Sequence, residues 1–187
     1  MDVLQKIEQY SSQLIVHKES IKEAVEELVG IFKDIDNNTI YLTGIGKSGH
    51  IARKCAATWQ SLGIRAHFLN AQDILHGDMG VMRYGDMVLY VTNSGASEEL
   101  LTIARYLKTV PVIQVSLTNN VEAPIDAYMN HPVTVGPTRI LEAGLAPSVS
   151  SVISMMILDI VGMSLAEGRG YSAKDFQVNH PSGALGK

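Results

Sequence analysis

The sequence contains one cysteine, few aromatic residues and no cluster of basic side chains. Because the cysteine, Cys55, stands alone, disulfide frameworks and cysteine-based metal centres are excluded, and a reducing compartment is expected. With a formal net charge of −4, the chain lacks the electrostatic footprint of a nucleic-acid-binding surface. The most apolar segment, residues 149–165, is slightly short for a membrane span and contains Asp159. The N-terminus lacks the apolar core of a signal peptide. We therefore expect a soluble cytoplasmic protein with neither nucleic acid nor a membrane as partner.

With 46% hydrophobic and 18% charged residues, the chain has the composition of an ordinary globular protein, and its length predicts one domain over residues 1–187. It opens with a helical pattern over residues 2–34, in which apolar side chains recur at three-four spacing: Leu4, Ile7, Leu14, Ile21, Val25, Leu28 and Phe32. A helix this long cannot cover its whole apolar stripe on a small sheet. We expect part of it to pack on another subunit, the alternative being a cap folded on its own domain.

Short apolar segments typical of buried strands alternate with helical patterns along the rest of the chain. These strands are predicted at residues 39–42, 66–69, 87–91, 110–115 and 133–135. The alternation predicts an α/β fold of three layers, a five-stranded parallel sheet flanked by helices. The helix from Pro147 to about Glu167 is apolar nearly all round, so we expect it to be buried, between subunits, with a structural hydrogen-bond partner for Asp159.

The organising motif of the chain is TIYLTGIGKSGH, residues 39–50. A strand runs into Gly44, Gly46 and Gly49, and a helical pattern follows. A helix N-terminus carries free N–H groups and partial positive charge, so a glycine-lined turn at this place predicts a phosphate cradle. Lys47 and Ser48 would point into it.

Three kinds of cradle and one structural alternative compete for this motif. The glycines satisfy the dinucleotide fingerprint, but that site expects an acidic residue at the end of the second strand, where this chain has Asn70. The P-loop pattern fails because Tyr41 stands in place of its first glycine. Two interpretations of the motif therefore remain. It is either a cradle for a single phosphorylated metabolite or a glycine turn that is needed only for folding.

A second loop of the same type follows the third predicted strand, with the sequence Thr92-Asn93-Ser94-Gly95-Ala96-Ser97. Taken alone, Ser94 or Ser97 with Glu98 and Glu99 could be an ordinary helix cap. Two such loops at the carboxyl ends of strands in one parallel sheet favour a phosphate ligand.

The pair TGIGKSGH and TNSGASEE resembles the sugar isomerase (SIS) domain family, whose members bind phosphosugars. The segments HGDMG (76–80), EAGLAPS (142–148) and DFQVNHPSGALGK (175–187) resemble those of D-arabinose 5-phosphate isomerases. The resemblance covers residues 39–187 and implies interconversion of D-ribulose 5-phosphate and D-arabinose 5-phosphate through an enediol. It also implies a supply of 3-deoxy-D-manno-octulosonate (Kdo) for lipopolysaccharide or capsule, and a homo-oligomer, a tetramer as in similar proteins, with shared active sites. Family members commonly continue into tandem CBS modules; this chain resembles a short form without them.

The resemblance assigns catalysis to Lys47, Glu99, Glu142 and His180. A carboxylate suits proton transfer between C2 and C1 if its site raises its pKa, so Glu142 or Glu99 would be the base. Lys47 would stabilise the oxyanion or the phosphate, and His180 would assist ring opening or relay a proton. Which of the four takes which role stays open.

Substrate binding is expected at seven further positions, Gly46, Ser48, His76, Asn93, Ser94, Gly95 and Ser97, with the serines at 48, 94 and 97 lining one anion site. We expect the histidines at 17, 67 and 131 to be structural and leave His50 open. No cofactor is expected. Some relatives carry a zinc-binding histidine where this chain has Asn70, so we expect no metal. Whether a sugar nucleotide inhibits the site stays open.

Two other functions compete with this one. Another phosphosugar isomerase, such as a 3-hexulose-6-phosphate isomerase, fits less well with the HGD segment and the closing HPSGALG. A non-catalytic phosphosugar sensor predicts loss of the acid–base set, whereas Glu99, Glu142 and His180 are all present.

Overall fold

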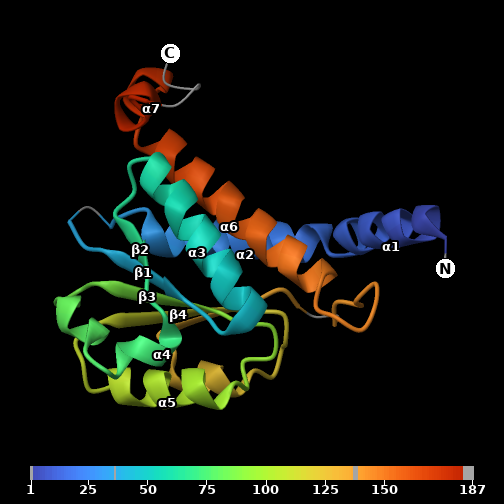
Figure 1. Cartoon of the computed structure of the whole chain (residues 1–187), viewed down its shortest axis with the longest axis horizontal. Helices are drawn as coiled ribbons and strands as arrows, with labels where there is room; N and C mark the ends of the chain where they lie inside the picture. The colour runs from blue at the N-terminus through green and yellow to red at the C-terminus, as the bar shows by residue number, and fades with distance from the viewer. Residues whose placement is uncertain (1, 36, 137–138, 183–187) are drawn as a thin grey trace.

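A computed structural model describes residues 2–35, 37–136 and 139–182 of the chain (Figure 1). Its centre is a five-stranded sheet in which every neighbouring pair is parallel, in the order β2-β1-β3-β4-β5. The strands are β1 (Ile40–Thr43), β2 (Ala66–Phe68), β3 (Met87–Val91), β4 (Ile113–Thr118) and β5 (His131–Thr134). The predicted fold class, with helices on both faces, is confirmed.

Two helical layers cover the sheet, each over its own apolar core. One layer contains α2 (Lys18–Phe32), α3 (Gly46–Ser61) and α6 (Val149–Gly168), with α1 (Val3–Val16) extending from it; the other contains α4 (Ala71–Ile74), α5 (Glu98–Leu107) and the 3₁₀ helices η1 (Asp78–Val81) and η2 (Pro124–Tyr128). A last helix, α7 (Ala173–Asn179), lies beyond the C-terminal ends of α3 and α6 (Figure 1).

The fourth strand differs from its prediction at both ends, since β4 runs over Ile113–Thr118 instead of 110–115. Val110 is in the turn after α5, where its N–H donates to the Leu107 carbonyl at 3.1 Å, and Pro111 has no N–H to give to a sheet. At the other end the strand continues through Ser116, whose buried hydroxyl donates to Asp126 at 2.8 Å. Because Ser116 and Thr118 are polar, this half of the strand lacks the continuous apolar pattern by which the other strands were predicted.

The predicted single helix over residues 2–34 is wrong: α1 and α2 are separate helices that meet at His17. His17 has φ −94° and ψ 9°, outside helical geometry, and its side chain is buried. The preceding Ile15 and Val16 are β-branched and exposed, so neither propensity nor packing holds the helix together there.

The apolar stripe predicted for this region divides at the same point. In α2 it is covered by the protein's own core, where Leu28 and Phe32 are fully buried. In α1, by contrast, Leu4 is 61% and Ile7 56% exposed. Figure 1 shows α1 projecting away from the sheet, so these apolar side chains have no cover from the described part of this chain.

The long helix α6 is partly a core helix of this one chain, packed on α2 and α3. Among the described residues it is the one helix long and apolar enough to cross a membrane, yet 56% of that window is buried inside the protein. Gly162 lies against the buried Trp59 ring of α3. Asp159 forms a salt bridge with Lys54, which confirms its predicted structural partner.

Burial and the Asp159 carboxylate raise the pKa of the Cys55 thiol to about 12, so this cysteine is an inert core residue.

Candidate active site

The strand order predicts a ligand site at the carboxyl edge of the sheet. After β1 the chain forms β2 on one side and then returns to form β3 on the other side of β1. In open parallel sheets, ligands bind beyond the carboxyl ends of the strands at such a reversal. The two motifs found in the sequence are the loops that follow β1 and β3, so both lie at this edge.

The glycines of the first motif allow β1 and α3 to pack closely. A Cβ atom on Gly44 would lie 2.7 Å from the Val91 carbonyl oxygen, and one on Gly49 would lie 2.6 Å from the Gly44 oxygen. Gly46, the first residue of α3, has φ 58°, which favours glycine. The helix starts without a side-chain cap on its N–H groups. The turn is therefore required by the fold and also leaves a helix N-terminus available to an anion.

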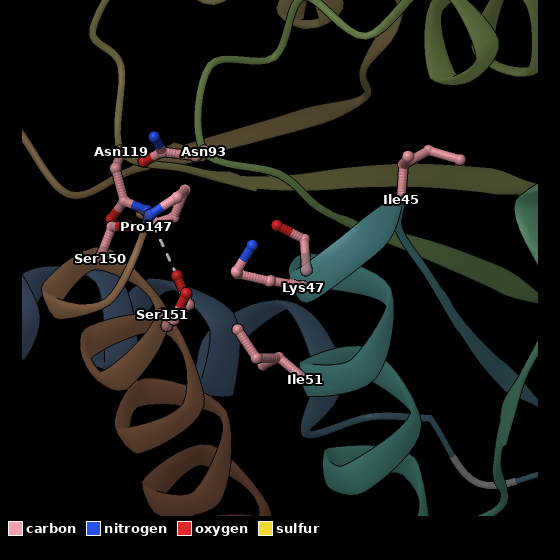
Figure 2. Close-up of a pocket in the computed structure, with 10 residues that line it drawn as sticks. Ile45, Lys47, Ile51, Asn93, Asn119, Pro147, Ser150 and Ser151 are labelled. Carbon is pink, nitrogen blue, oxygen red and sulfur yellow. Dashed lines mark hydrogen bonds between the residues drawn. The ribbon is translucent and has the colours of Figure 1, made fainter. Parts of the chain in front are cut away.

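Two adjoining cavities open at this edge, and we call them together the carboxyl-edge site. The first, of about 140 Å³, lies between the N-terminal turns of α3 and α6 (Figure 2). Its polar lining consists of Lys47, Ser48, Asn93, Asn119, Ser150, Ser151 and Ser154. The second, of about 310 Å³, shares the two asparagines and adds Ser94, Asn120, Arg139 and Glu142 as its polar lining.

Lys47 extends from the first turn of α3 into the first cavity (Figure 2). Its side chain is exposed, and none of the described carboxylates lies within ion-pair distance of it. A cation at a helix N-terminus is electrostatically unfavourable unless an anion lies nearby. The position of Lys47 therefore favours an anionic ligand in the site.

Glu142 caps the N-terminus of α6. Its carboxylate accepts hydrogen bonds from the backbone N–H groups of Ser148 and Val149 at 2.7 Å and of Ser150 at 3.3 Å, and from both serine hydroxyls. Burial raises the pKa of Glu142, but the hydrogen bonds from Ser150, Ser148 and Val149 together outweigh it, so the pKa lies below its ordinary value. The carboxylate is ionised at neutral pH, and in this arrangement it is a weak base.

Two glutamines of α1 hold the loop that carries Glu142. The Gln9 side chain donates to the Glu142 carbonyl oxygen at 3.1 Å, and the Leu141 N–H donates to Gln13 at 3.0 Å. The side chains lie one helical turn apart, so they hold consecutive residues of the loop. The helix with the uncovered apolar face is thus connected directly to the candidate base.

The second motif forms a tight loop around its own hydroxyls. Thr92 accepts the Gly95 N–H at 3.2 Å, and Ser94 accepts the Ala96 N–H at 3.2 Å. Gly95 has φ 67°, and a Cβ atom there would meet Ala123 at 2.6 Å. Ser94 lines the second cavity, whereas Ser97, the N-cap residue of α5, lines neither. Of the three serines expected at one anion site, two therefore line the carboxyl-edge site.

Glu99 and His76 lie together in a different place. Both are exposed and line a groove between α4 and α5, on the opposite helical layer from α3 and α6. Glu98 and Thr102 also line it. Within one chain, the second candidate base is therefore not in the carboxyl-edge site.

His180 lies at the far end of α3 from Lys47. It follows α7, and its ring nitrogens lie 2.8 Å from the Phe176 oxygen and 3.2 Å from the hydroxyl of Ser61, the last residue of α3. At 1.5 Å per residue, Lys47 and Ser61 are roughly 21 Å apart along the helix. Residues 183–187, the end of the closing motif, lie outside the described residues. The four expected catalytic side chains are thus not gathered within one chain.

Asn70 has an identifiable local role. Asn70 caps α4, accepting the Gln72 N–H and donating to Asp73. His17 is buried, whereas His67 is exposed and lies 3.2 Å from the Gln60 amide; their structural role stays a prediction. In the part of the chain that the structure describes, no three His, Cys, Asp or Glu side chains gather as a metal site would require.

Sequence reasoning missed six polar residues that line the carboxyl-edge site: Asn119, Asn120, Arg139, Ser150, Ser151 and Ser154. The serines carried a signal, because they recur at helical spacing in the first turns of an otherwise apolar helix. Asn119 follows β4 as Asn93 follows β3, which is the same carboxyl-edge position on a neighbouring strand.

Comparison with known proteins fits this architecture. The sequence profile of the SIS domain matches residues 35–162. The chain is 36% identical over 150 residues to the arabinose 5-phosphate isomerase KdsD of Pseudomonas aeruginosa, covering 79% of this chain and 46% of that protein. Against KdsD of Yersinia pestis it is 34% identical over 149 residues, covering 79% and 45%. The chain thus spans about half the length of the curated relatives it matches.

The solved structure of E. coli CFT073 c3406 in complex with arabinose 5-phosphate has a TM-score of 0.81 and 26% identity, covering 97% of this chain and 100% of that one. The chain belongs to the SIS domain family.

Proposed function

We propose that this protein is a phosphosugar isomerase that interconverts D-ribulose 5-phosphate and D-arabinose 5-phosphate. The observation that carries the proposal is the carboxyl-edge site, where the cation Lys47, two helix N-termini and the carboxylate Glu142 line adjoining cavities. The relatives support the choice of substrate, since two are named for this activity and the E. coli structure holds arabinose 5-phosphate.

The phosphate would bind at the start of α3, with Gly46 and Ser48 on one side and the β3 loop on the other. Asn93, Ser94 and Gly95 belong to that loop, and Ser97 lies just behind it at the start of α5. Backbone N–H groups and hydroxyls at helix N-termini suit a phosphate. Lys47 would stabilise the phosphate or the oxygen that becomes negative in the enediol.

Glu142 would transfer the proton between C2 and C1. The hydrogen bonds that lower its pKa also weaken it as a base, so we expect the bound sugar to draw the carboxylate away from the α6 N-terminus and raise its basicity. Glu99 remains the other candidate base. It lies outside the carboxyl-edge site in this chain and would have to reach a site from a neighbouring subunit.

We propose that the protein is a homo-oligomer, a tetramer, whose active sites are shared. The exposed apolar face of α1 supports assembly. The positions of His76, Glu99 and His180 support shared sites, because none of them lines the carboxyl-edge site of its own chain. We further propose a cytoplasmic location, no cofactor, and a product that supplies Kdo synthesis for lipopolysaccharide or capsule. Whether a sugar nucleotide inhibits the site stays open.

A non-catalytic phosphosugar-binding module is the second candidate, and the lowered pKa of Glu142 favours it. In that case the carboxylate would serve only as a cap of α6. The test is to incubate the protein with D-ribulose 5-phosphate and to quantify D-arabinose 5-phosphate, with a 3-hexulose 6-phosphate as control substrate. Turnover of the pentulose supports the proposal. Turnover of the hexulose alone indicates the other isomerase, and binding without turnover of either sugar indicates the module.

A further inference from the structure

Asn119 has a buried hydrogen-bonding atom that nothing in the described protein uses. It directly follows β4, is 8% exposed, and lines both cavities of the carboxyl-edge site. Its side-chain N–H donates to the Ser154 hydroxyl at 3.3 Å, and its backbone N–H donates to the Asn93 carbonyl at 3.1 Å. The side-chain oxygen Oδ1 is buried and has no partner among the described residues.

An unpaired buried amide oxygen is destabilising, so native proteins retain one mainly where a ligand or an ordered water uses it. Reversing the amide does not remove the problem, because the Ser154 hydroxyl can donate as well as accept and Nδ2 would then be left unpaired instead. The side chain therefore presents one free hydrogen-bonding atom to the described surroundings in either orientation.

The surroundings of Asn119 indicate which kind of ligand group it meets. In Figure 2 its side chain lies beside Asn93 and over the first turns of α6, where Ser150 and Ser151 are, and Lys47 extends from the facing helix. The cation and the α3 N-terminus suit a phosphate, whereas in the first cavity the side around Asn119 offers neutral amides and hydroxyls. The charged Arg139 and Glu142 line the second cavity. Neutral groups of this kind match the hydroxyls of a sugar.

We propose that Asn119 binds a hydroxyl group on the carbon chain of the phosphosugar, and that Ser154 is a positioning residue that fixes its amide. This inference rests on the proposed function and deepens it, because it divides the site into a phosphate half at α3 and a polyol half at β4 and α6. Asn119 then discriminates a phosphosugar from phosphate alone.

The test compares two ligands by isothermal titration calorimetry on the full chain, D-arabinose 5-phosphate and inorganic phosphate. Asn119→Ala should weaken binding of the sugar phosphate about tenfold, the effect of one lost hydrogen bond in a buried site, and change phosphate binding less than about twofold. Ser154→Ala should weaken sugar phosphate binding about threefold by releasing the amide. Asn130→Ala is the matched control: this exposed asparagine lies outside both cavities and accepts the Gln114 N–H, so both affinities should stay unchanged.

Equal losses for the two ligands, or no loss for either in Asn119→Ala and Ser154→Ala, would overturn the inference. If Asn119→Ala does not fold, as judged by circular dichroism, Ser154→Ala alone decides the question by the same ligand comparison. Wild-type protein that binds neither ligand contradicts the proposed function and this inference together. Tight binding of the sugar phosphate that neither substitution affects contradicts only the inference.

Discussion

Replacement of Glu142 by glutamine separates a catalytic carboxylate from a helix cap. The substitution keeps the size of the side chain but replaces one oxygen by an NH₂ group. In the folded protein both carboxylate oxygens accept backbone N–H groups, from Ser148 and Val149 on one oxygen and from Ser150 on the other. In either orientation of the glutamine amide, its NH₂ group therefore faces at least one backbone N–H group, and two donors cannot form a hydrogen bond.

The magnitude follows from these contacts. Loss of a charge-assisted hydrogen bond costs about 1.5–3 kcal/mol, and loss of a negative charge at a helix N-terminus costs about 0.3–1 kcal/mol. Because Glu142 is only half-buried, solvent screens part of this, and we expect the free energy of unfolding to fall by about 2 kcal/mol. If Glu142 is also the base, turnover should fall by about 10²–10⁴.

The stability effect should depend on pH. The pKa of Glu142 is lowered in the folded state, so its ionised form stabilises the fold above its unfolded pKa of about 4.3, and this contribution is lost as the pH falls through the folded value. Urea unfolding of wild-type and Glu142→Gln protein should therefore show the full difference at pH 7 and a smaller one at strongly acidic pH. Equal stability of the two proteins at pH 7 would refute the cap, and full turnover by Glu142→Gln would move the base to Glu99.

Three further predictions concern the cation, the helix packing and the assembly. Lys47→Ala should lower both turnover and phosphosugar affinity, measured by calorimetry, because it removes the cation beside the anionic ligand; unchanged affinity would place the phosphate elsewhere. Gly162→Ala should destabilise the fold by about 1–3 kcal/mol in urea unfolding, because its Cβ would lie 2.4 Å from the Trp59 ring, whereas Gly30→Ala in α2, with open space around it, should be neutral or slightly stabilising. Ile7→Asp should shift the protein to a smaller species in sedimentation, because it charges the exposed apolar face of α1; an unchanged oligomer would exclude that face as an interface.

The sequence predicted those parts of the fold that short-range physics determines. The strand–glycine–helix unit was readable because the glycines permit an approach of β1 to α3 that no side chain allows. The location of the candidate site was predicted from two such loops in a parallel sheet. The chain order of strands and helices was enough for the layers, although the polar half of β4, ending at Thr118, was not recognised as a strand.

What the sequence did not predict depends on contacts between distant segments. Nothing local indicates that Gln9 and Gln13 hold the Glu142 loop, which lies more than a hundred residues away. The lowered pKa of Glu142 arises because its carboxylate turns back onto the start of α6, the reverse of the raised pKa that base catalysis favours. The position of His180, one helix length from Lys47, is set by how α7 follows α6.

The polarity of the site was underestimated for a similar reason. Asn119, Ser150 and Ser154 looked like turn and helix residues, and only the packing of α6 beside α3 brings them to one cavity. Periodicity identifies buried faces and cannot say which polar residues of two helices will face each other.

The most direct test of the account is isomerisation of D-ribulose 5-phosphate in deuterium oxide, followed by proton NMR of the products. Proton transfer through an enediol at the carboxyl-edge site predicts D-arabinose 5-phosphate that carries deuterium at C2, because the transferred proton exchanges with solvent on the base. It also predicts a rate that falls at least about a hundredfold in Glu142→Gln. Tight binding of the sugar phosphate with no product from the wild-type protein would contradict the account and leave a phosphosugar-binding module in its place.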